Sequence, residues 1–148
     1  LDFYIKEIAA SVNIPLLVVG KIAEAFQDST AMPNVHFLGR VDDLAPYYLQ
    51  ATAVVAPILS GSGLKTKTVE ALRYGKYVIG SAEAFEGIPI LNYPGAGCEC
   101  HNTSDYISLI NSLKVAKTNE ASLRLFDEQF STATQLKRFS EFIMSTEQ

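Results

Sequence analysis

Four short apolar runs rich in β-branched residues recur through the first half of the chain. They cover residues 16–19, 35–38, 53–56 and 77–79. Polar and apolar positions alternate weakly or not at all within them, which is typical of parallel strands buried on both faces. A fifth, shorter strand is expected near residues 98–100.

Segments of helical character separate these runs. They cover residues 21–28, 42–50 and 65–74. Alternating strands and helices form βαβ units with right-handed crossovers. The pattern therefore predicts an α/β fold with a doubly wound parallel sheet.

Both ends of the chain have helical spacing without strands. Leu1, Ile5 and Ile8 repeat at helical intervals from the first residue, so we expect the chain to be a fragment of a longer protein. Helices are also predicted at residues 105–115, 120–130 and 131–144. Ser131 is expected to cap the last of these helices. Its inward-facing residues are expected to be Leu136, Phe139 and Ile143.

Composition narrows the classes of function. With 148 residues and a net charge of −4, the chain fits one globular domain and lacks the excess positive charge of a nucleic-acid or anionic-membrane surface. No apolar run approaches the roughly 20 residues of a membrane span. Cys98 and Cys100 are poorly placed to bridge, which favours a reducing, cytoplasmic setting.

Two lysines occupy an unusual place in the segment SGSGLKTKTVEALRYGKYVIGS, residues 60–81. A helix N-terminus carries partial positive charge and favours acidic residues, yet Lys65 and Lys67 begin this helix. They are explained if an anion binds there, because Gly61 and Gly63 let the backbone approach and its free N–H groups add to the attraction. A phosphate or pyrophosphate is the natural candidate.

Other residues follow the remaining strands at the same edge of the sheet. They are Gly20 with Lys21, Gly39 with Arg40, and residues 81–87. Ligands of parallel sheets bind beyond the carboxyl ends of the strands, so this placement predicts a phosphate-bearing small ligand. Glu70 lies one helical turn beyond Lys67, about 5–6 Å along the axis, where it can accept hydrogen bonds from ribose hydroxyls. The alternative is a surface ion pair between Lys67 and Glu70.

Residues 33–81 carry a family resemblance. The matching features are the Asn-Val-x-Phe-x-Gly segment at 34–39, the strand ending at Pro57, the glycine-rich loop at 61–63, and Glu70-Ala71-Leu72 with Gly75 and Val78. Together they resemble the C-terminal, nucleotide-sugar-binding domain of retaining group-1 glycosyltransferases. The resemblance extends over roughly residues 14–115 and implies a Rossmann-like domain, one half of a GT-B fold, with C-terminal helices.

The resemblance implies an enzyme that transfers a sugar, with retention, from a nucleotide diphosphate sugar to an acceptor glycan, lipid or other hydroxyl. Residues 1–148 would be its single donor-binding domain, inactive alone and partnered by an N-terminal acceptor domain. Polysaccharide biosynthesis in the cytoplasm is the expected setting. Peripheral membrane association through the missing half stays open, as do the base, the sugar, the acceptor and the oligomeric state.

The resemblance also implies roles for individual residues. Glu70 would hold the ribose, Val41 would meet the base, and Lys65 and Lys67 would meet the pyrophosphate. The whole expected donor site is Gly20, Lys21, Arg40, Val41, Ser60, Gly61, Ser62, Gly63, Leu64, Lys65, Lys67, Thr68 and Glu70.

One departure leaves the catalytic residues unassigned. Many members of the family carry a second glutamate seven residues or so before the first, and Ser62 lies eight residues before Glu70. No cofactor or metal is expected, because preplaced cations and amides can stabilise a departing diphosphate. Asp42 and Asp43 are adjacent and are expected to begin a helix.

Several residues have simpler structural explanations. His36 is expected to be a packed or edge residue of a strand and His101 to lie in a loop. Tyr47 and Tyr48 would anchor a helix to the sheet. Glu83 and Glu86 would either serve the donor site or cap a turn.

Two other functions remain alternatives. One is a nucleotide-sugar epimerase of the same architecture, and the other is a non-catalytic module for protein association. Nicotinamide or flavin binding is disfavoured because no G-x-G-x-x-G follows the first strand.

Overall fold

The computed structural model describes residues 1–26, 33–61, 65–114 and 118–146. Three residues of the expected donor site, Ser62, Gly63 and Leu64, lie outside this description. So does the end of the helix expected at residues 21–28.

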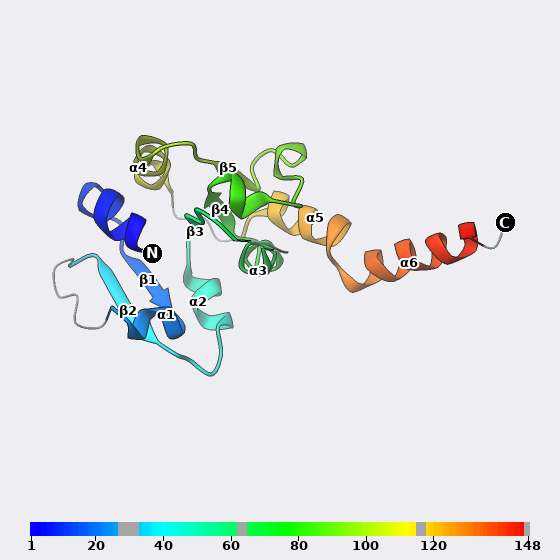
Figure 1. Cartoon of the computed structure of the whole chain (residues 1–148), viewed down its shortest axis with the longest axis horizontal. Helices are drawn as coiled ribbons and strands as arrows, with labels where there is room; N and C mark the ends of the chain where they lie inside the picture. The colour runs from blue at the N-terminus through cyan, green and yellow to red at the C-terminus, as the bar shows by residue number, and fades with distance from the viewer. Residues whose placement is uncertain (27–32, 62–64, 115–117, 147–148) are drawn as a thin grey trace.

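The described strands are all parallel but form two sheets (Figure 1). Their bounds are β1 Leu16–Val19, β2 Val35–Gly39, β3 Ala53–Ala56, β4 Tyr77–Gly80 and β5 Gly97–Glu99. One sheet has the order β1-β2 and the other the order β3-β4-β5. The expected α/β fold with parallel strands is confirmed, and the arrangement is Rossmann-like, although β1 and β3 form no ladder with each other.

Helices connect and flank these strands. Their bounds are η1 Tyr4–Ile8, η2 Ala9–Ser11, α1 Lys21–Glu24, α2 Ala45–Gln50, α3 Thr66–Arg73, η3 Ala82–Phe85, η4 Ile90–Asn92, α4 Thr103–Ser112, α5 Glu120–Gln129 and α6 Thr132–Thr146. The first is a π-helix, and the other η elements are 3₁₀ turns.

Two apolar cores lie on opposite faces of the strands. The first packs η1 and α4 against the strands, with Ile8, Ile79 and Ile110 buried in it. The second packs α3 and α5, with Leu72 and Val78 among its buried residues. Successive side chains of a strand point to opposite faces, which is why Val78 and Ile79 enter different cores. The result is a three-layer α/β/α arrangement.

The last helix departs from expectation. Ser131 does cap it, since the Thr134 N–H donates to Ser131 Oγ at 3.3 Å. The prediction that its apolar residues face inward is wrong, because Leu136, Phe139 and Ile143 are 63, 63 and 41% exposed. Helix α6 runs away from the body of the molecule beyond α5, so its apolar side reaches neither core (Figure 1).

None of the helices in the described ranges combines the length and apolar character needed to cross a bilayer.

Candidate functional site

Glycines with positive φ follow three of the strands at their carboxyl ends. Gly20 has φ 108°, Gly39 has φ 69° and Gly61 has φ 152°, conformations that side-chain-bearing residues rarely adopt. The Gly20 N–H donates to the Gly39 carbonyl at 2.6 Å, which joins the loops after β1 and β2. A Cβ on Gly20 would meet nothing within 4 Å, so the backbone angle and not lack of space requires glycine there.

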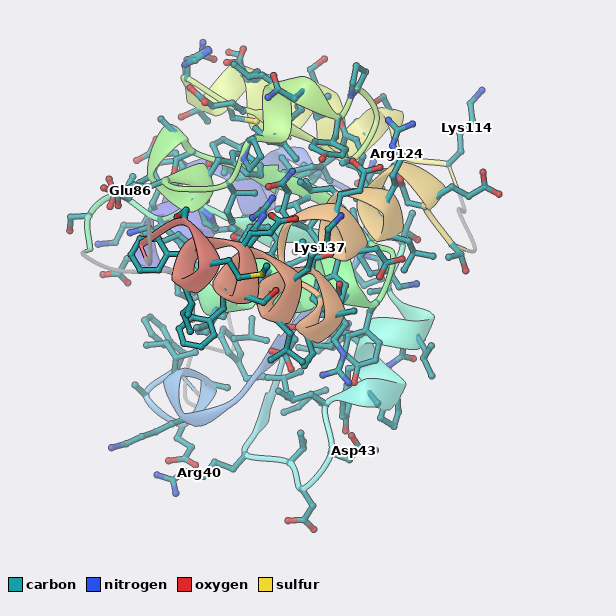
Figure 2. The ribbon with its side chains drawn as sticks, turned by 90° about the vertical axis from the view of Figure 1, so that its right-hand side faces the viewer. Arg40, Asp43, Glu86, Lys114, Arg124 and Lys137 are labelled. Carbon is teal, nitrogen blue, oxygen red and sulfur yellow. The ribbon has the colours of Figure 1, made fainter. Side chains whose placement is uncertain are left out.

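The two outer cations of the expected site are exposed, one on α1 and one beside it. Lys21 is exposed at the start of α1. Arg40 Nε lies 3.2 Å from Glu24 Oε1, and its side chain is 67% exposed. Figure 2 shows Arg40 pointing outward, well separated from Glu86. The structure therefore does not bring Arg40 to the start of α3. Val41, which follows Arg40, is half-buried.

Lys65 is buried and already has anionic partners. It precedes α3, is 7% exposed, and donates from Nζ to Glu83 Oε1 at 2.8 Å and to the Gly61 carbonyl at 2.6 Å. Glu86 Oε2 lies 3.2 Å from the same nitrogen. Hydrogen bonding to Glu83, aided by Glu86, raises the pKa of Lys65 above its usual value. Two carboxylates of the protein itself therefore lie beside the Lys65 ammonium group.

Lys67 occupies the outer side of the same helix turn. It is exposed, and it lines both a cavity of about 690 Å³ and a smaller one of about 210 Å³ beside Val19 and Pro57. No described ion pair involves Lys67 among the residues placed by the structure. Lys67 is therefore the cation of this loop that remains available to an incoming anion.

Glu70 lies one turn further along α3 and also lines the larger cavity. Its Oε2 accepts a hydrogen bond from the Tyr48 hydroxyl at 3.2 Å. The Tyr48 ring stacks on Tyr74 with centroids 4.8 Å apart, so the donor itself is held in place. Burial, with the neighbouring Glu70 carboxylate, raises the pKa of Tyr48 well above its usual value. The hydroxyl consequently stays a donor to Glu70 over the physiological range.

Sequence reasoning did not assign Tyr48 to the site. It expected the ring to anchor α2 to the sheet, and Tyr48 does pack against the second core, which contains Ala56 and Val78 of the strands. Its ring and hydroxyl also join α2 to α3. This contact depends on how the two helices pack against each other, so the local sequence pattern does not predict it.

Two polar residues of this region have structural partners. Thr68 is fully buried, and its hydroxyl donates to the Ala84 carbonyl at 2.9 Å, which fixes the loop after β4 to α3. Lys76 is 2% exposed, and its Nζ donates to the Leu49 carbonyl at 3.1 Å near the end of α2. Thr68 thus connects α3 to the loop after β4, and Lys76 connects the start of β4 to the end of α2. Ser60 is exposed at its edge.

The remaining candidates do not assemble a metal site. Within the described ranges, no group of three His, Cys, Asp or Glu side chains could hold an ion. His36 is exposed on β2 and lines the larger cavity, and His101 Nδ1 lies 3.5 Å from Glu99 Oε1. Both cysteines are free thiols. Asp43 Oδ1 accepts from the Ala45 N–H at 2.8 Å, but α2 begins at Ala45 after Leu44, so Asp42 and Asp43 precede the helix that they were expected to begin.

Comparisons with known proteins identify the family of this chain. The family model described as glycosyl transferases group 1 matches residues 1–113. The search of curated proteins found no match, and the search of solved structures found none either. The family match covers the parallel strands, the glycine turns after them and the helix that carries Lys67 and Glu70. The chain therefore belongs to the group 1 glycosyl transferases.

Proposed function

We propose that this domain binds the nucleotide diphosphate part of a sugar donor, and that the full-length enzyme transfers the sugar with retention of configuration. An N-terminal domain of the same enzyme would bind the acceptor. Membership of the group 1 glycosyl transferases supports sugar transfer in general. The positions of Lys67 and Glu70 support a nucleotide diphosphate as the ligand.

The observation that carries the proposal is the presence of an exposed cation and a fixed carboxylate on one side of α3. Lys67 is exposed and Glu70 is held by Tyr48, and both line one cavity. An ammonium group at a helix N-terminus, with the backbone N–H groups there, attracts a phosphate. A carboxylate one turn away accepts hydrogen bonds from vicinal hydroxyls such as those of ribose.

The same groups account for catalysis without a metal. When the bond between the anomeric carbon and the diphosphate oxygen breaks, negative charge accumulates on the departing diphosphate. Lys67 and the amides at the start of α3 would stabilise that charge, because preplaced donors and cations need no rearrangement during the reaction. Lys65 contributes indirectly, since its bonds to Gly61 and Glu83 connect the two loops around the site.

Calorimetric titration of the chain with UDP, GDP, ADP and their sugars tests the proposal. Losing a charge-assisted bond costs about 1.5–3 kcal/mol, so Lys67→Ala should weaken binding of the preferred nucleotide about 10- to 100-fold. The matched control is Lys137→Ala on α6, whose lysine pairs at 3.9 Å with Glu141 and should leave affinity unchanged. Equal affinity of Lys67→Ala and the parent chain would contradict the proposal.

A second titration isolates the ribose contact. The parent chain should bind a nucleoside diphosphate more tightly than its 2′,3′-dideoxy analogue, because only the former can donate hydroxyl hydrogens to Glu70. Glu70→Gln should reduce that preference, since a neutral amide oxygen is the weaker acceptor. A preference that survives the substitution would remove Glu70 from the ribose site.

A further inference from the structure

Tyr48 contacts the carboxylate of the proposed donor site without belonging to α3. Its hydroxyl donates to Glu70 Oε2 at 3.2 Å, and both side chains are half-buried and line the cavity of about 690 Å³. The Tyr48 ring stacks on Tyr74, with centroids 4.8 Å apart and ring planes 6° from parallel. A hydrogen bond to an ionised carboxylate is stronger than one between neutral groups, so this contact can fix the direction of the Glu70 side chain.

Helical geometry places the contact on the same side of α3 as Lys67. At about 100° per residue, Tyr74 and Lys67 lie about 40° and 60° to one side of Glu70. Arg73 lies about 60° to the other side. Because Tyr48 packs on Tyr74, it approaches Glu70 from the side of Lys67. The lining of the cavity agrees, since it includes Lys67 and Glu70 but not Arg73.

Lys67 and Glu70 form no ion pair in the described part of the chain, although their spacing favours one. Side chains three residues apart on a helix have Cβ atoms about 5–6 Å apart, and opposite charges at that spacing attract each other. The hydrogen bond from Tyr48 gives the Glu70 carboxylate a different partner on the same side of the helix. A pair between Lys67 and Glu70 would neutralise the ammonium group and occupy the carboxylate at once.

We propose that Tyr48 is a positioning residue that keeps Glu70 from pairing with Lys67. The consequence for binding rests on the proposed function, whereas the effect on the two side chains does not. With Tyr48 in place, the Lys67 ammonium group stays open to a diphosphate, and Oε1 of Glu70 stays open to ribose hydroxyls. Tyr48 thereby favours ribose diphosphates as ligands without touching them.

Crystal structures of the ligand-free 148-residue chain and of its Tyr48→Phe variant test the positioning directly. The variant keeps the ring that stacks on Tyr74 but loses the hydroxyl that donates to Glu70. In the variant we expect the Glu70 carboxylate within about 4 Å of Lys67 Nζ, the distance of an ion pair. A carboxylate that keeps its place in Tyr48→Phe would overturn the proposal.

Tyr74→Phe is the matched control for these structures. It removes a hydroxyl from the other ring of the same stack and leaves the bond from Tyr48 to Glu70 intact. Glu70 should therefore stay on Tyr48 in this variant. A Glu70 side chain that moves to Lys67 in Tyr74→Phe as well would contradict a specific role for the Tyr48 hydroxyl.

Titration with inorganic pyrophosphate measures the consequence for Lys67. Pyrophosphate carries no ribose, so Glu70 affects its binding only through the charge of Lys67. A helical ion pair of the usual strength competes with the ligand and should weaken binding about two- to threefold in Tyr48→Phe. In a Glu70→Gln background, Tyr48→Phe should have no effect, because a neutral amide does not neutralise the lysine. Equal losses in the two backgrounds would mean that Tyr48 acts only on the stability of α2 and would contradict the proposal.

The ribose contact gives a second readout in solution. The probe is whichever of UDP, GDP and ADP binds the parent chain most tightly, compared with its 2′,3′-dideoxy analogue. Loss of a fixed acceptor should lower the preference for the ribose form about 2- to 10-fold in Tyr48→Phe, as in Glu70→Gln. An undiminished preference in Tyr48→Phe would contradict the positioning of Glu70 by Tyr48.

The parent chain separates a failure of this inference from a failure of the proposed function. Pyrophosphate binding that does not depend on Lys67 would contradict the proposed function, and the ligand-free structures would still decide where Glu70 lies. Binding that depends on Lys67 but is the same in Tyr48→Phe would leave the proposed function standing and overturn the role of Tyr48.

Discussion

Lys65 and Lys67 share one helix end but meet different surroundings. Lys65 is buried between Glu83 and Glu86, whereas Lys67 is exposed on the cavity side. A lysine at a helix N-terminus opposes the helix dipole, so each needs a source of negative charge. The protein supplies it for Lys65, and a ligand would supply it for Lys67.

We predict that the two lysines separate stability from binding. Lys65→Met should lower the melting temperature, because it leaves two loop carboxylates without their cation and releases Gly61. Lys67→Met should leave the melting temperature nearly unchanged and reduce nucleotide affinity. Thermal unfolding followed by circular dichroism compares the two variants, and equal melting temperatures would contradict the assignment.

Buried tyrosines make stability depend on alkaline pH. Burial raises the pKa of Tyr106 to about 12 from 10.0. The unfolded state therefore loses this proton first, and the stabilisation present below pH 10 is lost as the pH rises toward 12. Urea unfolding at several pH values in this window should show a steeper loss for the parent chain than for Tyr106→Phe. Parallel pH dependences would show that Tyr106 has no part in it.

At the scale of elements, α6 and α5 show the difference between an exposed and a buried apolar residue. Phe139 on α6 is 63% exposed, while Leu125 on α5 is fully buried in the second core. Near the start of α6, Thr134 and Arg138 donate to carbonyl groups at the end of α5.

Substitutions of Leu125 and Phe139 should differ several-fold in how much they lower the free energy of unfolding. Leu125→Ala is expected to lower the free energy of unfolding by about 2–5 kcal/mol, since it leaves a cavity. Phe139→Ser should change it by no more than about 0.5 kcal/mol, as is usual for exposed positions. Denaturant unfolding of both variants measures the difference. A large loss for Phe139→Ser would mean that α6 packs in solution against something that the described contacts omit.

The molecule as a whole is acidic, with a net charge of −4, so an anionic ligand is attracted only locally. Lys67 is exposed, and interactions of exposed charges are screened by salt. The dissociation constant for a nucleoside diphosphate should therefore rise as sodium chloride increases from about 0.05 to 0.5 M. Over this range the Debye length falls below about 10 Å, so the attraction between Lys67 and the phosphates is screened. Lys67→Ala should flatten this dependence, and an unchanged slope in the variant would place the phosphate elsewhere.

Local sequence determined where the strands lie and which residues occur near their carboxyl ends. Short β-branched runs favour strands, and β1 and β3 have the predicted bounds. The glycines after β1, β2 and β3 were recognisable because positive φ is a property of one residue and its neighbours. Glu70 and Lys67 could be placed on one side of α3 from helical periodicity alone.

Tertiary structure decided which groups are already occupied and which remain open. The carboxylate partners of Lys65 come from a loop 18 or more residues away, and Tyr48 reaches Glu70 across 22 residues, so no local pattern specifies either contact. The same holds for α6, whose apolar periodicity is that of a packed helix although its path leaves the body. Whether the strands join into one sheet depends on long-range pairing, and β1 and β3 form no ladder with each other.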